Sequence, residues 1–320
     1  MIKLVSIIPH LNKFLFKYKL FSKIKMPRYL IHWFTTCSGG LCDRILGLSA
    51  SICIAKMLNM KILIKWDHTD LSSGFKINKE FNWYENQCEF KKVIFNNLEY
   101  RDYFKDENII EKWGNDNILI WSNMNLFHYA LQNPHLKHII PSNYIEKMSE
   151  AIHLVLEEIF IINKNILDNV PVYDKGIHIR TGDNQIYNKD KEESYREYIV
   201  NIFKKIKDFT NDNDNFFISS DCLLSFKIAE DCFKNFEYNK GSIVHTNQEI
   251  NEDGLNKVLL DLLTLCKCKN ELYIGWHSNF SRISALYNLN RKFICYEYEN
   301  SPVIKEFSNE VLFSYFSWGK

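Results

Sequence analysis

The stretch YLIHWFTTCSGGLCDRILGLSASICIAKMLNMKILIKW, residues 29–66, decides the fold. It opens with a short apolar, aromatic-rich run at 29–35, which predicts a buried strand, and the run Cys-Ser-Gly-Gly at 37–40 predicts a turn. Residues 43–58 place apolar side chains on one helical face, and residues 61–66 read as a second strand. A strand, a glycine turn, a helix and a second strand form a βαβ unit, which implies a parallel sheet.

The second half of the chain alternates strands and helices regularly, which is typical of a doubly wound α/β domain. We expect strands at 176–180, 216–219, 242–244, 272–275 and 292–296, and helices at 193–209, 223–233, 254–266 and 280–287. Between the two alternating regions, a strand is expected at 118–121 and a helix at 143–160.

A length of 320 residues favours two domains. We place them at 29–165 and 166–320, after a basic amphipathic segment at 1–28. Hydrophobic residues make up 46% and charged residues 25%, as in soluble globular proteins. A net charge of +1 argues against a dedicated nucleic-acid binder, and nine Cys without framework spacing favour a reduced, cytoplasmic protein.

The N-terminal segment concentrates positive charge. Residues 1–42 hold seven Lys and Arg and no Asp or Glu. Apolar residues recur there near helical spacing at Phe14, Leu15, Tyr18 and Phe21. Two interpretations stay open: a helix packed on the protein's own surface, or peripheral contact with an anionic membrane through residues 1–26.

Three strand-to-helix junctions carry candidate binding residues. The first contains Gly39, Gly40, Asp43 and Arg44, where glycines let a ligand approach the backbone and the helix N-terminus favours negative charge. It is neither a dinucleotide fingerprint nor a P-loop, and a plain tight turn is the alternative.

The segment Gly-Ile-His-Ile-Arg-Thr-Gly-Asp at 176–183 is the sharper signal. Its strand presents His178 and Arg180 on one face, two residues apart. Ligands of open α/β sheets bind beyond the carboxyl ends of strands, and the forked guanidinium of Arg180 suits a diphosphate. The alternative is a surface arginine paired with Asp183.

Two later strand ends repeat this chemistry. Ser219, Ser220 and Asp221 follow an apolar strand, and a carboxylate there can accept hydrogen bonds from guanine or a ribose hydroxyl. The run at 277–282 can hold a phosphate through its hydroxyls and N–H groups; it comprises His277, Ser278, Asn279, Phe280, Ser281 and Arg282. Helix capping by Ser and Asp is the alternative at both places.

Two patterns are weaker than they look. Asp212-Asn213-Asp214 matches the Asp-x-Asp of metal-dependent glycosyltransferases, but it precedes a strand and is typical of a solvated turn. Cys266 and Cys268 have no second Cys or His pair at zinc spacing. We therefore expect no metal site.

Together the segments resemble the fucosyltransferase superfamily that includes the α1,2-, α1,6-, protein-O- and nodulation fucosyltransferases. Residues 40–44 resemble its Gly-Leu-Gly-Asn-Arg loop, and residues 178–183 its His-x-Arg-Arg-x-Asp motif. Residues 219–221 resemble its strand end near the guanine, and Asp261 with residues 278–281 its C-terminal Asp and Ser-x-Phe-Ser phosphate loop.

The resemblance implies a GT-B fold, two Rossmann-like doubly wound domains facing a cleft, with the donor bound mainly by the second. It implies inverting, metal-independent transfer of fucose from GDP-fucose to a glycan or protein hydroxyl. Arg180 would stabilise the departing diphosphate with Ser278 and Ser281, and Asp43 or Asp183 would act as base.

This chain departs from the family pattern in two places. Thr181 stands where the family has a second Arg, and Cys42-Asp43 replace Gly-Asn. Two rival functions therefore stay open: a GT-B glycosyltransferase using another nucleotide sugar, and a non-catalytic binder of a nucleotide sugar or glycan.

Overall fold

The computed structural model describes residues 27–35, 39–67, 71–95, 98–181, 192–211, 213–243, 251–275, 278–296, 304–306 and 308–314. The expected amphipathic segment at 1–28 lies outside the described residues, except for its last two. Within the described ranges, no helix combines the length and the apolar character needed to cross a membrane.

The first sheet has four strands in the order β2-β1-β5-β4, and every neighbouring pair is parallel. The βαβ unit predicted from residues 29–66 is confirmed, because α2 connects the two parallel strands β1 and β2. The bounds are β1 (Tyr29–Phe34), α2 (Leu41–Met57), β2 (Lys61–Trp66), β4 (Lys92–Phe95) and β5 (Ile118–Trp121).

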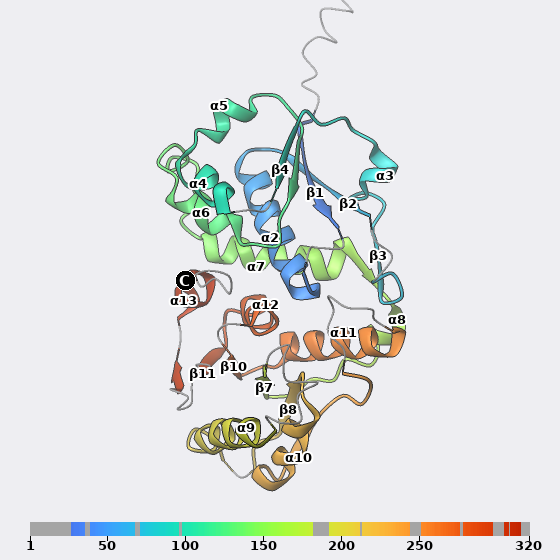
Figure 1. The fold of residues 1–320 in the computed structure, drawn as a ribbon, viewed down its shortest axis with the longest axis vertical. Helices are drawn as coiled ribbons and strands as arrows, with labels where there is room; N and C mark the ends of the chain where they lie inside the picture. Colours follow the sequence, from blue (N-terminus) through green and yellow to red (C-terminus); the bar gives the residue numbers. More distant parts are fainter. Residues whose placement is uncertain are drawn as a thin grey trace, which may run out of the picture.

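The second sheet has six strands in the order β12-β11-β10-β7-β8-β9, and its pairs are parallel except for β11 and β12. Its strands are β7 (Lys175–Ile179), β8 (Phe216–Ser220), β9 (Phe236–Glu237), β10 (Glu271–Gly275), β11 (Lys292–Tyr296) and β12 (Ile304–Glu306). The helices are α9 (Glu192–Lys207), α10 (Leu223–Cys232), α11 (Glu252–Lys267) and α12 (Asn279–Tyr287). In Figure 1, α9 and α10 lie on one side of this sheet and α11 and α12 on the other.

The remaining elements belong mostly to the first half of the chain. They are β3 (Phe75–Ile77), α3 (Trp83–Asn86), α4 (Leu98–Asp106), α5 (Ile109–Trp113), α6 (Leu126–Gln132), α7 (Tyr144–His153), the π-helix η1 (Leu154–Ile159), β6 (Phe160–Ile162), α8 (Lys164–Leu167) and α13 (Asn309–Ser314). β3 and β6 form a separate antiparallel pair.

The strand expected at 242–244 is wrong. The edge position of the second sheet is occupied by β9 instead. The reason lies in Ser242, whose backbone N–H and hydroxyl both donate to Asp253 of α11, at 2.8 and 2.9 Å. A backbone donor satisfied by a helix carboxylate needs no strand partner. Val244 lies outside the described residues.

The helix expected at 143–160 is also partly wrong. It ends as the π-helix η1, and Phe160 already belongs to β6. The ring of Phe160 stacks on Phe75 of β3 with centroids 4.2 Å apart, and both rings are buried. Burial of this aromatic pair in the β3–β6 ribbon outweighs the continuation of an apolar helical pattern.

α2 is buried nearly all round, because the first sheet and helices from both halves of the chain cover it. It packs against α6, α7 and α12. The packing is close at Gly47, where a Cβ would lie 2.3 Å from the carbonyl oxygen of Ser122. These contacts fix the N-terminus of α2, where the glycine turn enters.

The two halves share one apolar core. Leu259 of α11 and Ile283 of α12 belong to the same buried cluster as α2 and α7. The chain then returns to the first half through α13, whose Phe313 packs edge-on against Phe127 and beside Tyr144. Figure 1 shows α12 and α13 directly below the helices of the first half.

Candidate functional site

The glycine turn and the start of α12 meet, although 236 residues separate the two that touch. Asp43, in the first turn of α2, accepts a hydrogen bond of 2.5 Å from the side-chain amide of Asn279 in α12. Asn279 in turn accepts a hydrogen bond of 2.7 Å from Arg282, which is buried. The first and third predicted junctions are therefore neighbours in space.

The carboxylate of Asp43 stabilises the glycine turn. Gly40 is the N-cap of α2 and donates its N–H to Asp43 at 3.0 Å. Gly39 has a φ of +75°, and a Cβ there would lie 2.7 Å from a carboxylate oxygen of Asp43. Both the left-handed backbone and the close approach of the carboxylate therefore require glycine at position 39.

Arg44 is directed into the protein. It is 1% exposed, its Nε donates to the carbonyl of Gly39 at 3.1 Å, and its guanidinium lies 5.2 Å from the Trp66 ring centroid. Such contacts hold the turn in place from inside. A role of Arg44 in donor binding stays a prediction.

His178 joins β7 to α12. Its Nδ1 lies 2.6 Å from the hydroxyl of Ser281, and its ring stacks on Phe280 with centroids 4.8 Å apart. The side chain is only 4% exposed. The second and third predicted junctions are thus also in direct contact.

Arg180 pairs with Asp221. Its Nη1 donates to one oxygen of Asp221 at 2.7 Å. Thr181 donates its backbone N–H and its hydroxyl to the other oxygen at 2.8 and 2.9 Å. Asp221 therefore holds Arg180 and Thr181, the two residues that follow β7, while Asp183 lies outside the described residues.

Tyr296, at the end of β11, binds the backbone at the end of β7. Its hydroxyl donates to the carbonyl of His178 at 2.5 Å and accepts the N–H of Arg180 at 3.0 Å. Gly275 leaves room for it, because a Cβ there would lie 3.0 Å from the Tyr296 hydroxyl. Sequence analysis missed this residue, since a tyrosine ending a buried strand carries no distinguishing signal.

Asp261 lies in a buried polar cluster. Its oxygens accept hydrogen bonds from Ser219 at 3.0 Å, Lys257 at 2.6 Å and Asn239 at 2.8 Å. Burial raises the pKa of Asp261, with the charge of Lys257 and the hydrogen bonds opposing the rise. The i,i+4 spacing of Lys257 and Asp261 on one helix was the signal that could have found the pair.

The remaining predicted hydroxyls differ in their surroundings. Ser220 shares a 2.9 Å hydrogen bond with Ser225 and accepts the N–H of Cys222, so it serves the turn into α10. Ser278 is the N-cap of α12, yet its side chain makes no capping hydrogen bond. His277 lies outside the described residues.

Cys42, between the glycine turn and α2, is buried. Burial raises its pKa well above the ordinary value, the carboxylate of Asp43 adds to the rise, and the charge of Arg180 opposes it.

In the described part of the chain, no group of three His, Cys, Asp or Glu side chains is arranged to hold a metal ion. Asp214 of the Asp-x-Asp pattern pairs with Lys175 at 2.7 Å, and Asp212 lies outside the described residues.

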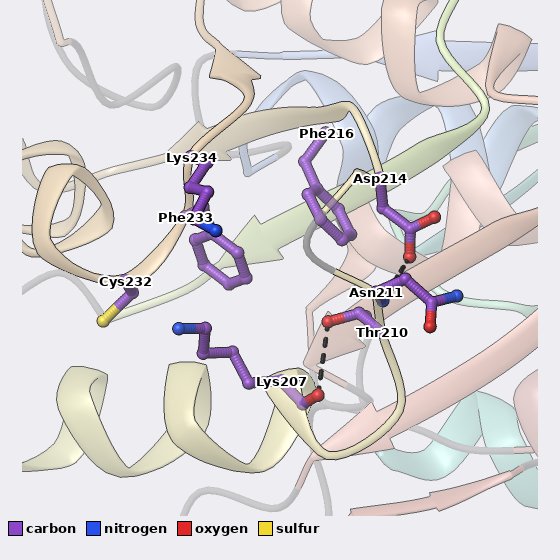
Figure 2. A pocket seen from close by; sticks show the side chains of 8 residues that line it. All are labelled: Lys207, Thr210, Asn211, Asp214, Phe216, Cys232, Phe233 and Lys234. Atoms are coloured by element: carbon purple, nitrogen blue, oxygen red, sulfur yellow. Dashed lines mark hydrogen bonds between the residues drawn. The ribbon is translucent and has the colours of Figure 1, made fainter.

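A small hollow lies away from these junctions. Figure 2 shows it beside the start of β8, between the end of α9 and the end of α10. Its lining residues are Lys207, Thr210, Asn211, Asp214, Phe216, Cys232, Phe233 and Lys234. It therefore sits at the end of the sheet opposite to the one carrying Arg180 and Asp221, where ligands of such sheets are not expected.

The fold matches solved fucosyltransferase structures. A structure of NodZ alpha-1,6-fucosyltransferase soaked with GDP-fucose has a TM-score of 0.57 and 13% identity, covering 88% of this chain and 99% of that chain. NodZ from Bradyrhizobium gives the same values in a selenomethionine form. A mutant of Arabidopsis thaliana FUT1 in complex with GDP gives a TM-score of 0.60 and 13% identity, over 92% and 77%.

The chain has the fold of these fucosyltransferases. The α/β class, the two parallel sheets and the GT-B architecture expected from the sequence are confirmed by this likeness. No protein-family model matches the chain, and no curated protein sequence does.

Proposed function

We propose that the protein is an inverting glycosyltransferase that transfers fucose from GDP-fucose to a hydroxyl of a glycan or protein. The observation that carries the proposal is the convergence of three junctions on the first turn of α12. The Asp43–Asn279 and His178–Ser281 hydrogen bonds join the glycine turn and the end of β7 to that turn. Structures of the same fold with GDP-fucose or GDP support a nucleotide-sugar donor.

The diphosphate of the donor would lie at the N-terminus of α12. A helix N-terminus attracts anions through its N–H groups and the positive end of its dipole. Ser278 caps this helix without a side-chain hydrogen bond to it, so its hydroxyl can serve a phosphate oxygen. His178 would act by holding Ser281 and Phe280 in place beneath that turn.

Arg180 would stabilise the charge that develops on the departing diphosphate. Arg180 donates to Asp221 through Nη1 at 2.7 Å. Its side chain keeps 24% exposure. Asp221 thus orients Arg180 before the donor arrives, and a preorganised donor group is the kind that lowers a barrier most effectively.

Two carboxylates are candidates for the base that would accept the proton of the acceptor hydroxyl, Asp43 and Asp183. Both oxygens of Asp43 already accept amide N–H groups, from Gly40 and Asn279. We propose that Asp43 mainly fixes the distance between the two halves, and that Asp183 is the other candidate base. Because cationic side chains and helix N–H groups can carry the leaving-group charge, we propose transfer without a metal ion.

Calorimetric titration of the full chain with GDP, UDP and ADP tests the donor. We expect GDP to bind, Arg180→Ala to weaken that binding, and Arg196→Ala to leave it unchanged. Arg196 is a suitable control because it is an arginine of α9 whose side chain is 45% exposed. Preference for UDP or ADP would favour a glycosyltransferase using another nucleotide sugar, and GDP binding without transfer would favour a non-catalytic binder.

A further inference from the structure

Three aromatic side chains surround one lysine near the carboxyl ends of β1 and β2. The Nζ of Lys65 lies 5.0 Å from the ring centroid of Trp33, 5.5 Å from Trp83 and 5.7 Å from Tyr84. Asp67 completes the group: it accepts hydrogen bonds from Lys65 at 2.6 Å, from Trp33 Nε1 at 2.5 Å and from the Tyr84 hydroxyl. We name these five residues the aromatic patch.

The fold holds the aromatic patch rigidly. Parallel pairing of β1 and β2 places Trp33 beside Lys65. The segment before α3 is attached to the edge of β2, because Ile64 donates its N–H to Phe81 at 2.7 Å. The indole N–H of Trp83 then donates to the carbonyl of Cys88 at 3.0 Å. A preorganised surface of this kind loses little conformational entropy when a ligand binds.

The aromatic patch is accessible to ligands. Tyr84 is 44% exposed, and the side chains of Asp67 and Lys65 keep 27% and 18% exposure. Figure 1 shows α3 at the outer edge of the first sheet, beside β2. The strand β1 that carries Trp33 leads into the glycine turn, so the patch lies at the same end of the sheet as the proposed donor site.

We propose that the aromatic patch binds a sugar residue of the acceptor glycan; its role as the acceptor subsite rests on the proposed function. A sugar presents an apolar C–H face, which a flat aromatic ring can cover, and hydroxyls that both donate and accept hydrogen bonds. Tyr84 offers the exposed ring and a hydroxyl that can accept, and Lys65 can donate to a sugar hydroxyl.

The chemistry of the patch disfavours other occupants. A cationic ligand would compete with Lys65, which already lies between the rings. A dry protein interface would remove water from the Lys65–Asp67 ion pair, and taking two charges out of water is costly. A hydroxyl-rich ligand replaces that water with its own donors and acceptors.

Saturation-transfer NMR on the full chain tests the inference. The probes are cellotetraose, chitotetraose, mannotetraose and lactose, each measured with and without GDP. The variants are Tyr84→Ala, Tyr84→Phe and, as a control, Tyr238→Ala, which alters a tyrosine of similar exposure, 36%, in the second half of the chain. Circular dichroism confirms that each variant is folded.

We expect at least one oligosaccharide to bind to the native protein. Tyr84→Ala should weaken that binding about tenfold or more, as truncating an aromatic anchor commonly does. Tyr84→Phe, which keeps the ring, should retain most of it, and Tyr238→Ala should bind normally. Absence of binding by all four probes would overturn the inference, and so would normal oligosaccharide binding by Tyr84→Ala. A native protein that forms a dimer, which the Tyr84→Ala substitution dissociates, would also overturn it. Because GDP binding is read separately, failure of the donor proposal is distinguishable from failure here.

Discussion

The carboxylate of Asp43 in α2 accepts a hydrogen bond of 2.5 Å from the side chain of Asn279 in α12. This contact crosses between the halves of the chain, and it continues to Arg282 on one side and to Gly40 on the other. The glycine turn, the predicted phosphate-binding helix and a buried arginine are therefore parts of one hydrogen-bonded chain. Its geometry sets where a donor could lie between them.

Exchanging the two residues tests that chain. Asp43→Asn turns an amide N–H₂ toward the amide of Asn279, and Asn279→Asp turns a carboxylate toward Asp43. Each single change should cost about 1.5–3 kcal/mol of unfolding free energy. The double exchange rebuilds the bonds to Gly40, across the interface and to Arg282, so it should recover most of the loss.

Urea denaturation of the native protein, both single variants and the double variant measures this coupling. Asp208→Asn, at an exposed position in the loop after α9, serves as the control and should have little effect. If the double variant loses as much unfolding free energy as the two single variants together, the Asp43–Asn279 hydrogen bond does not contribute to stability.

His32 makes the stability depend on pH. It is fully buried in β1 beside Ser51, and burial lowers its pKa to about 3, with a hydrogen bond to the Ser122 backbone opposing the shift. The unfolded chain titrates near 6.5, so protonation favours unfolding below that pH. Stability is complete above pH 6.5 and falls toward pH 3, by roughly 2 kcal/mol at pH 5.

His32→Asn, which keeps a polar side chain near Ser51 without titrating in this range, should flatten the change between pH 7.5 and pH 5. The exposed His135, changed to Asn, should not flatten it. Denaturant midpoints at the two pH values decide the matter, and an unchanged slope in His32→Asn would contradict the assignment.

The buried pair of Lys257 and Asp261 should be sensitive to loss of one partner. Lys257→Met leaves the Asp261 carboxylate among Ser219 and Asn239 without its counter-charge. Removing one member of such a pair costs about 3–5 kcal/mol. Lys267→Met, at an exposed position near the end of the same helix, should cost little. Equal denaturant midpoints for the two variants would show that Asp261 does not need Lys257.

Chelation tests the proposed metal independence. The leaving-group charge is assigned to Arg180, Ser278 and the N-terminus of α12, so transfer should continue in EDTA. Rates measured by nucleoside-diphosphate release, before and after dialysis against EDTA, check this. Loss of activity that manganese or magnesium restores would contradict this prediction and make Asp212 and Asp214 the candidate metal ligands.

Local patterns predicted the βαβ unit and most of the second sheet, because strands buried on both faces and helices with one apolar face are readable in sequence. Residues 61–66 and 118–121 form strands with the expected bounds. The predictions that were wrong, at 242–244 and 143–160, depended on side-chain partners outside the predicted segments: Asp253, 11 residues after Ser242, and Phe75, far from Phe160 in the sequence. The local pattern of a segment does not show which side chains from outside it will bind to it.

In the candidate site, too, the sequence predicted the residue types but not their contacts. Glycines, hydroxyls and charges at strand ends were visible, but their pairing was not. Asp221 holds Arg180 and Thr181, and Asp261 accepts hydrogen bonds from Lys257 and its neighbours. A role of Asp221 toward a nucleotide stays a prediction. The aromatic patch was missed because Trp33, Lys65 and Tyr84 come together only through strand pairing and the attachment of α3 to β2.

The claim that Arg180 stabilises the departing diphosphate is tested most directly by measuring transfer by the Arg180→Ala variant. Turnover of GDP-fucose with an acceptor or water should fall about a hundredfold or more, since one preorganised donor at the departing oxygen contributes roughly 3 kcal/mol. Arg180→Lys should recover little, because a point charge lacks the two-pronged geometry. The measurement needs a folded variant, shown by circular dichroism. A folded Arg180→Ala protein with near-native turnover would contradict the account.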